Sequence, residues 1–221
     1  MDLLRQNNPQ DDLQLDCKIL YDIAVACGLE YLRIGCNTRI LHFDIKSHNI
    51  LLDDDFCPKI SDFGLAKICP KKESIVSIFG ARGTPGYIAP ELFFRNFGEV
   101  SYKSDVYSYE MMMLEMVGRR KNIKVEVNCL SELYFPHWIY QRFELNQDLG
   151  LKCIKNEIYE EMVRKMTTVS LWCIQTNPSN RPAMHKVVGM LEGSLQVLEI
   201  PPKPFFSSPS LSSIHLSSEI L

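Results

Sequence analysis

The chain has 221 residues, of which 46% are hydrophobic and 23% are charged, an ordinary composition for a soluble globular protein. This length is sufficient for one large domain with a substantial core, and the net charge of −3 gives no electrostatic reason to expect nucleic-acid binding. No run of about 18 apolar residues occurs, and the polar N-terminus lacks the apolar segment of a signal peptide. We therefore expect a soluble, cytoplasmic chain without a membrane span.

The eight cysteines allow a disulfide framework, a zinc site or ordinary reduced side chains. No C-x-x-C pair occurs, and several cysteines lie on apolar helical faces. We therefore predict that the cysteines are reduced and structural, as is usual in the cytosol.

The first segments of the chain predict a lead-in and a helix. Residues 1–15 are mostly polar and are expected to be frayed. Over residues 16–34, apolar side chains recur at the spacing of a buried helix. Residues 39–41 then form a short apolar approach to His42.

A hairpin is expected next. Residues 50–60 contain an apolar triplet, three consecutive aspartates and a Pro-Lys-Ile run, a pattern typical of two short strands joined by a turn. Such a hairpin delivers the chain to Ser61 and Asp62. The segment 62–91 is rich in Gly, Ser, Lys and Thr, as expected of a mobile loop.

The second half of the chain predicts helices. Ser104 is a suitable N-cap for a helix that runs to about Val117 and is closed by Gly118. This helix is apolar nearly all round, so we expect it to be central and buried. Further helices are expected at residues 131–143, 156–174 and 182–193.

The composition changes again at Pro201, where Pro-Pro-Lys-Pro is followed by many serines. This composition predicts a disordered tail over residues 201–221. The proline-rich run is most simply a linker after the last helix, and an SH3-type ligand is the alternative.

Chemistry is concentrated in three short runs. Residues 42–49 read His-Phe-Asp-Ile-Lys-Ser-His-Asn, residues 61–64 read Ser-Asp-Phe-Gly, and residues 89–91 read Ala-Pro-Glu. Any one of these polar residues alone is most simply a solvated turn residue. Solvated turn residues are a far poorer explanation for all three runs occurring together in this order.

The residue types in these runs suit phosphoryl transfer, which needs a positioned hydroxyl, an acceptor for its proton and positive charge beside the phosphate. Asp44 is the candidate proton acceptor, and Lys46, two residues on, is the candidate cation. Asn49 offers a carbonyl oxygen and Asp62 a carboxylate, both of which suit Mg²⁺. The predicted hairpin would bring these two metal ligands together.

The order and spacing of the three runs resemble the catalytic loop, the metal-binding turn and the end of the activation segment of eukaryotic protein kinases. Further detail, in residues 44–46, 83–91 and 104–108, is similar to plant receptor-like serine/threonine kinases of the leaf-rust-resistance type. The resemblance extends from about residue 16 to residue 204.

This resemblance implies ATP and Mg²⁺ as cofactors and a protein substrate. Leu51 would lie under the adenine, next to the nucleotide ligands Lys46, Asn49 and Asp62. Thr84 would contact Asp44 and Lys46 and mark a Ser/Thr kinase.

The resemblance also implies structural roles for a second group of residues. Glu91 would form a buried pair with Arg181, for which two exposed charges are the alternative. Asp105 would brace the backbone of the catalytic loop, and His42 and Phe63 would support it.

Two residues depart from the family pattern. Phe43 replaces the arginine that would bind a phosphate on the activation loop, so loop phosphorylation is not expected to activate by that route. Glu110 replaces a glycine in the middle of the apolar helix. A buried, unpaired carboxylate there would be costly and would have a raised pKa, unless the side chain reaches solvent.

The residues before His42 contain no G-x-G-x-x-G loop and no strand with a V-A-I-K-like lysine. We therefore expect a mainly α fold: a kinase C-terminal lobe over residues 16–200 with a small β-hairpin at the catalytic cleft, between the lead-in 1–15 and the tail 201–221. The N-terminal lobe would be missing, and the parent protein would be a plasma-membrane receptor with this part on its cytoplasmic side.

Two functions follow from this reading. One is the catalytic lobe of a serine/threonine kinase whose activity on its own is doubtful. The other is a catalytically idle, pseudokinase-like scaffold that binds other kinases. Implied partners are another kinase or a protein that supplies an N-terminal lobe. Because apolar residues such as Leu51 and Phe63 would lack that cover, we expect self-association and weak ATP binding.

Overall fold

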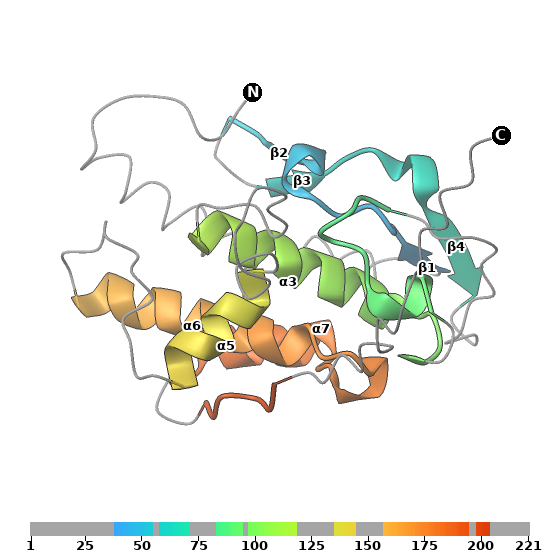
Figure 1. The fold of residues 1–221 in the computed structure, drawn as a ribbon. Helices are drawn as coiled ribbons and strands as arrows, with labels where there is room; N and C mark the ends of the chain where they lie inside the picture. Colours follow the sequence, from blue (N-terminus) through green and yellow to red (C-terminus); the bar gives the residue numbers. More distant parts are fainter. Residues whose placement is uncertain are drawn as a thin grey trace, which may run out of the picture.

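The computed structural model of the chain describes residues 38–54, 58–70, 83–94, 97–118, 135–144, 157–194 and 198–203. Over these ranges helix exceeds strand, in agreement with a mainly α fold. The expected lead-in 1–15 and the helix expected at residues 16–34 lie outside the described residues, as does the tail from residue 204 onward. The tail was expected to be disordered from residue 201, but residues 201–203 are described, and the Pro202 carbonyl accepts hydrogen bonds from Tyr140 and Gln175. Helix α3 runs through the middle, with the strands on one side and helices α5, α6 and α7 on the other (Figure 1).

Two antiparallel pairs make up the described β structure. Strand β2 (Ile50–Leu52) pairs with β3 (Pro58–Ile60), which confirms the predicted hairpin. Strand β1 (Thr38–Leu41) pairs with β4 (Lys67–Pro70), a second ladder that was not expected from the sequence. The pairing of β1 with β4 is longer than that of the hairpin and joins segments on either side of residues 42–66.

Helix α3 (Tyr102–Gly118) is the central element. All of its residues from 104 to 114 are buried, as the lack of a polar face predicts. The predicted N-cap was wrong: the helix begins at Tyr102, and the hydroxyl of Ser101 accepts a hydrogen bond from the Lys103 N–H at 3.2 Å. Ser104 lies within the first turn.

Three further helices pack beside α3. They are α5 (Phe135–Glu144), α6 (Glu157–Cys173) and α7 (Met184–Glu192). Helix α6 contacts both α3 and α7 and so links the central helix to the outer one. The predicted ranges agree with these helices except at their ends. Pro182 was expected in the first turn of α7, but it precedes the helix by two residues.

Single 3-10 turns connect these elements and position the residues of interest. Their bounds are Ser47–Asn49 (η1), Phe63–Leu65 (η2), Pro90–Leu92 (η3) and Pro178–Asn180 (η5). Among the described helices, none is long and apolar enough to cross a membrane. Cys173 is a free, buried cysteine, as predicted. Most of the other cysteines lie outside the described residues.

A buried ion pair anchors η3 to the segment before α7. Both oxygens of Glu91 accept hydrogen bonds from Arg181 at 2.7 Å, and both side chains are fully buried. Ser104 donates a further hydrogen bond to Glu91 at 2.7 Å. The three remaining guanidinium hydrogens bond to the backbone carbonyls of Lys103, Gln175 and Thr176. All five donors of Arg181 are thus used, which is the condition under which a buried pair repays its desolvation.

Candidate active site

The catalytic loop begins where β1 ends, and α3 holds its backbone. The buried carboxylate of Asp105 accepts hydrogen bonds from the N–H groups of His42 at 2.7 Å and Phe43 at 2.8 Å. The pKa of Asp105 is raised to about 6, because burial raises it by more than these two hydrogen bonds lower it. Phe43 has a φ of 63°, a conformation that is rare for a residue with a side chain. Asp105 therefore holds the loop in a backbone shape that the sequence alone does not favour.

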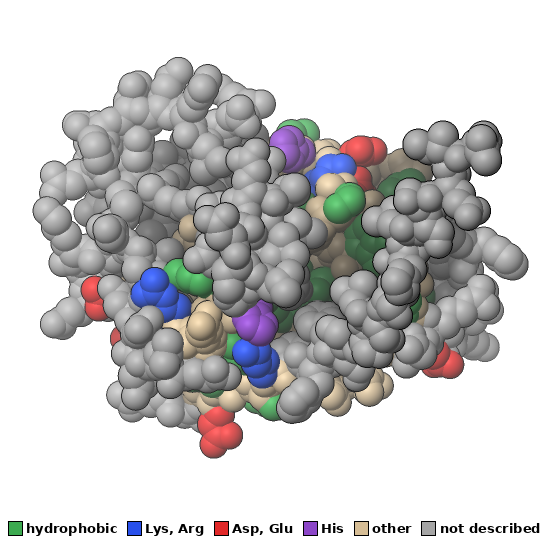
Figure 2. Space-filling view, viewed as in Figure 1, with side chains coloured by type: hydrophobic (Ala, Val, Ile, Leu, Met, Phe, Trp, Pro, Cys, Tyr) green, Lys and Arg blue, Asp and Glu red, His purple; other side chains and the backbone are tan. Residues whose placement is uncertain are grey.

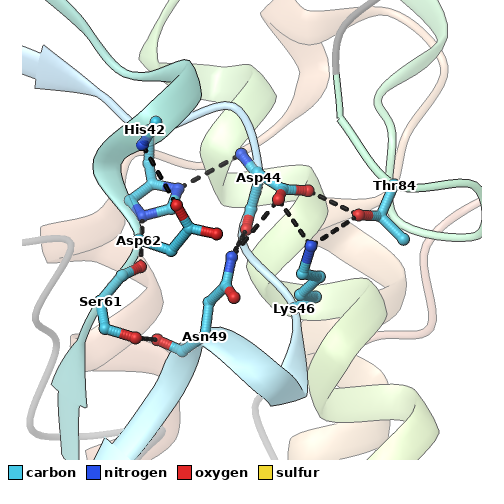
Figure 3. A network of polar contacts seen from close by, with 8 residues as sticks. His42, Asp44, Lys46, Asn49, Ser61, Asp62 and Thr84 are labelled. Carbon is cyan, nitrogen blue, oxygen red and sulfur yellow. Dashed lines mark hydrogen bonds and ion pairs between the residues drawn. The ribbon is translucent and has the colours of Figure 1, made fainter.

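Asp44 lies at the centre of a polar network (Figure 3). One of its oxygens accepts a hydrogen bond from the Thr84 hydroxyl at 2.6 Å, and the other forms an ion pair with Lys46 at 2.6 Å. Lys46 also donates to the Thr84 hydroxyl at 3.1 Å, which closes a triangle of three side chains. Asn49 donates to the Asp44 carbonyl at 2.8 Å.

These contacts decide the charge of Asp44. Burial alone would raise the pKa of this carboxyl. The hydrogen bonds from Lys46 and Thr84, the charge of Lys46 and the Asn49 amide more than offset burial, so the pKa of Asp44 lies below its usual range. Asp44 is therefore ionised at neutral pH and can only accept hydrogen bonds.

The hairpin places Asn49 beside Asp62. The carbonyl of Asn49 accepts hydrogen bonds from the Ser61 N–H at 2.8 Å and the Ser61 hydroxyl at 3.0 Å. These bonds hold the end of β3 against η1. Figure 3 shows the side chains of Asp44, Asn49 and Asp62 gathered around one space.

Asp62 adopts a left-handed backbone conformation, with a φ of 60°. Its carboxylate is exposed and accepts a hydrogen bond from the Gly64 N–H at 3.3 Å. A Cβ at Gly64 would lie only 3.1 Å from that carboxylate, so glycine permits the tight turn. The turn thus presents a carboxylate oxygen toward open space.

The donor set of Asn49 and Asp62 suits a hard divalent cation, because it consists of a carboxylate and an amide oxygen. Within the described ranges, no group of three or more His, Cys, Asp or Glu side chains could hold a metal alone. A cation held by these two residues would need further oxygen ligands, such as those of a bound phosphate.

His42 connects the catalytic loop to the turn that carries Asp62. Its Nδ1 accepts a hydrogen bond from the Asp44 N–H at 3.3 Å, and its Nε2 lies 3.0 Å from the Ser61 carbonyl. Because Nδ1 accepts, the ring proton lies on Nε2 and is donated to Ser61. The ring also packs against Phe63, with 4.9 Å between ring centroids. His42 thus contacts both the loop and the turn, and the supporting roles of His42 and Phe63 stay predictions.

Two features of this region were not recognised from the sequence. Gly83 has a φ of 112°, and a Cβ there would lie 2.6 Å from the Phe43 carbonyl, so only glycine lets the segment carrying Thr84 approach the loop. Tyr87 donates a hydrogen bond to Glu115 of α3 at 2.9 Å, and its pKa is raised to about 12 by burial and by this contact. Glycine and tyrosine are too common for either role to be read from composition.

Several apolar side chains near the site are exposed. Leu51 is 55% exposed, Phe63 is 45% exposed and Ile68 is 71% exposed. Figure 2 shows hydrophobic side chains visible on the side of the molecule that carries the strands. The residue expected beneath the adenine is therefore accessible.

The sequence that builds this site is similar to sequences of known proteins. A family model described as the protein kinase domain matches residues 5–190. The chain belongs to the protein kinase family. The expected resemblance to leaf-rust-resistance-type receptor-like kinases is also confirmed by its relatives.

Three relatives illustrate this similarity. An Arabidopsis thaliana leaf rust 10 disease-resistance locus receptor-like protein kinase-like 2.8 is 54% identical over 93% of this chain and 25% of the relative. The rust resistance kinase Lr10 of Triticum aestivum is 56% identical over 86% of this chain and 30% of the relative. The Arabidopsis protein SUPPRESSOR OF NPR1-1 CONSTITUTIVE 4 is 52% identical over 93% of this chain and 19% of the relative. The kinase chain thus spans less than a third of the length of each of these relatives.

Glu110 of this kinase chain is buried, with 2% of its surface exposed, so the alternative that it reaches solvent was wrong. One carboxylate oxygen accepts a hydrogen bond from Ser170 of α6 at 2.7 Å, and the other has no hydrogen-bond partner. The pKa of Glu110 is raised to about 7, because burial raises it by more than Ser170 and the thiol of Cys173 lower it. The expected cost of this buried carboxylate is thus reduced by Ser170 and Cys173 and not removed.

Proposed function

We propose that this chain is the catalytic lobe of a receptor-like serine/threonine protein kinase and transfers the γ-phosphate of ATP to Ser or Thr hydroxyls of proteins. The observation that carries the proposal is the ionised Asp44, held by Lys46 and Thr84 at 2.6 Å each. The sequence similarity to receptor-like kinases supports the same class of reaction.

Asp44 would accept the proton of the substrate hydroxyl. Its lowered pKa keeps it ionised before the substrate arrives, so that it orients the hydroxyl and takes the proton as the phosphate bond forms. Lys46 would stand beside the transferred phosphoryl group and offset its negative charge.

Thr84 would set the position of this pair and the class of substrate. Its hydroxyl donates to Asp44 and accepts from Lys46, so it fixes the distance between the proton acceptor and the cation. By family resemblance, a threonine in this position is a mark of Ser/Thr kinases.

Asn49 and Asp62 would hold Mg²⁺, which would supply positive charge to offset the negative charge of the ATP phosphates. Leu51 would lie under the adenine, where its exposed apolar surface suits a flat ring. Phe43, buried in the core, offers no cation for a phosphorylated activation loop. Activation would therefore not depend on loop phosphorylation through that position.

A magnesium–ATP titration of the 221-residue chain tests the proposal. We expect weak, saturable binding that Asp62→Asn weakens about tenfold or more, because the metal loses a charged ligand. Asp54→Asn is the matched control, since Asp54 is an exposed carboxylate in the turn between β2 and β3. Equal loss in both variants would contradict a metal role for Asp62.

The exposed side chains of Leu51, Phe63 and Ile68 favour a second function, that of a scaffold that docks other kinases. In that case the polar network would be inherited and idle. Association with a kinase in the absence of any ATP binding would support the scaffold and oppose the enzyme.

A further inference from the structure

We propose that the surface formed by α5 and α6 is a binding site for an extended, proline-rich segment, and that residues 199–203 of the same chain occupy it. We call this segment the strap. The inference does not rest on phosphoryl transfer and concerns the face of the helical region drawn beside α5 in Figure 1.

The strap is held through its backbone carbonyls. Trp172 of α6 donates its indole N–H to the Glu199 carbonyl at 2.8 Å. Tyr140 of α5 and Gln175 each donate to the Pro202 carbonyl at 3.3 Å. Three donors from two helical regions thus converge on two carbonyls of one short segment.

The spacing of these carbonyls fits a polyproline II conformation. Residues 198–203 form neither helix nor strand, and the prolines at positions 201, 202 and 204 restrict the backbone to extended conformations. A polyproline II helix has three residues per turn, so carbonyls three residues apart face the same side. Glu199 and Pro202 are three apart, and both face the helices.

The side chains of the strap divide in the same way. Pro201 is buried against the protein, whereas Pro202 is exposed and contributes only its carbonyl. Leu198, just before the strap, packs against the hydrophobic core. A polyproline II segment that buries a proline and presents its carbonyls to aromatic donors is a recurring mode of peptide recognition.

The donors on the protein are held in place by contacts of their own. Gln175 also donates to the Leu171 carbonyl at 2.9 Å and to the Tyr140 hydroxyl at 3.3 Å. The two contacts of Gln175 do not involve the strap, so they hold Gln175 and the Tyr140 hydroxyl together when the strap is absent. A site whose donors are fixed beforehand loses little entropy when an extended, stiff segment binds.

The strap therefore joins α5 to α6. It contains most of the proline-rich run for which a linker and an SH3-type ligand were the two expected roles. In this arrangement the run is a ligand of the chain itself. An outside protein that binds the same run would have to displace it from Trp172 and Tyr140.

The test uses the full chain with Trp138→Phe, so that Trp172 is the only tryptophan. In this background we compare Pro201→Asp, which places a charge at the buried position, with Pro202→Ala, which keeps the carbonyl at the exposed position. The probe in trans is a capped peptide with the sequence of residues 197–204. The readouts are acrylamide quenching of Trp172 and the rate of Glu-specific proteolysis after Glu199.

We expect Pro201→Asp to raise cleavage after Glu199 about fivefold or more and to increase quenching of Trp172, because both report the released strap. The peptide should reverse the quenching and bind this variant about tenfold more tightly than the unsubstituted chain, whose site is occupied. Pro202→Ala should stay within about twofold of its parent in both readouts.

Equal cleavage rates and equal quenching in the two proline variants would overturn the proposal. So would failure of the peptide to bind the Pro201→Asp chain, provided that this chain keeps its helical circular dichroism. If Pro201→Asp loses that helical signal, Tyr140→Phe decides, because it removes one donor and no ring. Faster cleavage after Glu199 in Tyr140→Phe supports the site, and an unchanged rate opposes it.

Discussion

Asp44 illustrates how single residues of this chain depend on a few neighbours. Its carboxylate would be disfavoured by burial, yet the Lys46 ammonium and the Thr84 hydroxyl keep its pKa low. These contacts are partly buried and fix the position of the Asp44 carboxylate.

Asp44→Asn should abolish phosphate transfer from ATP by a longer protein that contains this chain. The amide cannot take up the hydroxyl proton, and loss of a general base costs about 10²-fold or more. Incorporation of radiolabelled phosphate into a protein substrate checks the result, with thermal unfolding as the control for stability. Activity within about threefold of the parent would refute the role.

Glu110 is the residue whose environment should make stability depend on pH. Its folded pKa of about 7 lies above the ordinary value of 4.5, so the folded state binds its proton more tightly than the unfolded state. Protonation of Glu110 therefore stabilises the folded state, fully below about pH 4.5, and this stabilisation is lost as the pH rises through about 7. The full difference is roughly 3 kcal/mol, from about 1.4 kcal/mol per unit of pKa.

Urea unfolding at pH 5 and pH 8 measures this effect against Glu110→Gln, which cannot ionise. We expect the free energy of unfolding of the parent to fall between these two pH values by about 2 kcal/mol more than that of the variant. The neighbouring Asp105 has the same sign but is present in both proteins, so it cancels. Parallel pH profiles would mean that Glu110 is stabilised as an anion.

At the scale of elements, α3 organises the site and the helical packing together. Its Asp105 holds the catalytic loop, its Glu115 holds Tyr87, and its Glu110 meets α6. A helix buried on all sides can serve each neighbour with a different face. The position of α3 depends on the pair of Glu91 and Arg181. At the first turn of the helix, Glu91 accepts a hydrogen bond from Ser104, and Arg181 donates one to the Lys103 carbonyl.

Arg181→Leu should destabilise the fold strongly, because it leaves the fully buried Glu91 carboxylate without its cation. We expect a loss of about 3–5 kcal/mol in the free energy of unfolding. Lys59→Gln is the matched control, since Lys59 and Asp53 form an ion pair at 3.4 Å on the surface, and its loss should cost at most about 1 kcal/mol. Chemical denaturation at neutral pH compares the two, and similar losses would show that the buried pair is not an anchor.

At the scale of the whole molecule, the exposed side chains of Leu51, Phe63 and Ile68 stand out. Exposed apolar residues beside a candidate nucleotide site indicate a surface that another polypeptide can cover. Leu51 lies in β2, Ile68 in β4 and Phe63 in the turn η2, so the surface lies on the side of α3 that carries the strands (Figure 1).

We expect the chain to self-associate as its concentration rises, and sedimentation velocity measures this. The double variant Leu51→Ser, Ile68→Ser should shift the dissociation constant by about tenfold toward monomer. Phe94→Ser is the matched control, because Phe94 is 60% exposed and lies in the segment after η3. A monomer at all concentrations, or an equal shift with Phe94→Ser, would contradict the prediction.

Local patterns were sufficient for several parts of this protein. The hairpin of β2 and β3 follows from an apolar triplet and a turn, and α3 and α6 follow from the distribution of apolar residues. The resemblance to protein kinases implied contacts of Thr84 with Asp44 and Lys46 and a pair of Glu91 with Arg181, and the structure contains those contacts. The catalytic and metal-binding roles of the site residues stay predictions.

The sequence by itself determined the class of chemistry and most of the described helices, because these depend on residue type and on spacing along the chain. Only the tertiary structure decided the pairing of β1 with β4, the burial of Glu110 against Ser170 and the docking of the strap on Trp172. Each joins segments far apart in the chain. Such contacts depend on which surfaces remain free after the core has packed, and no local pattern records that.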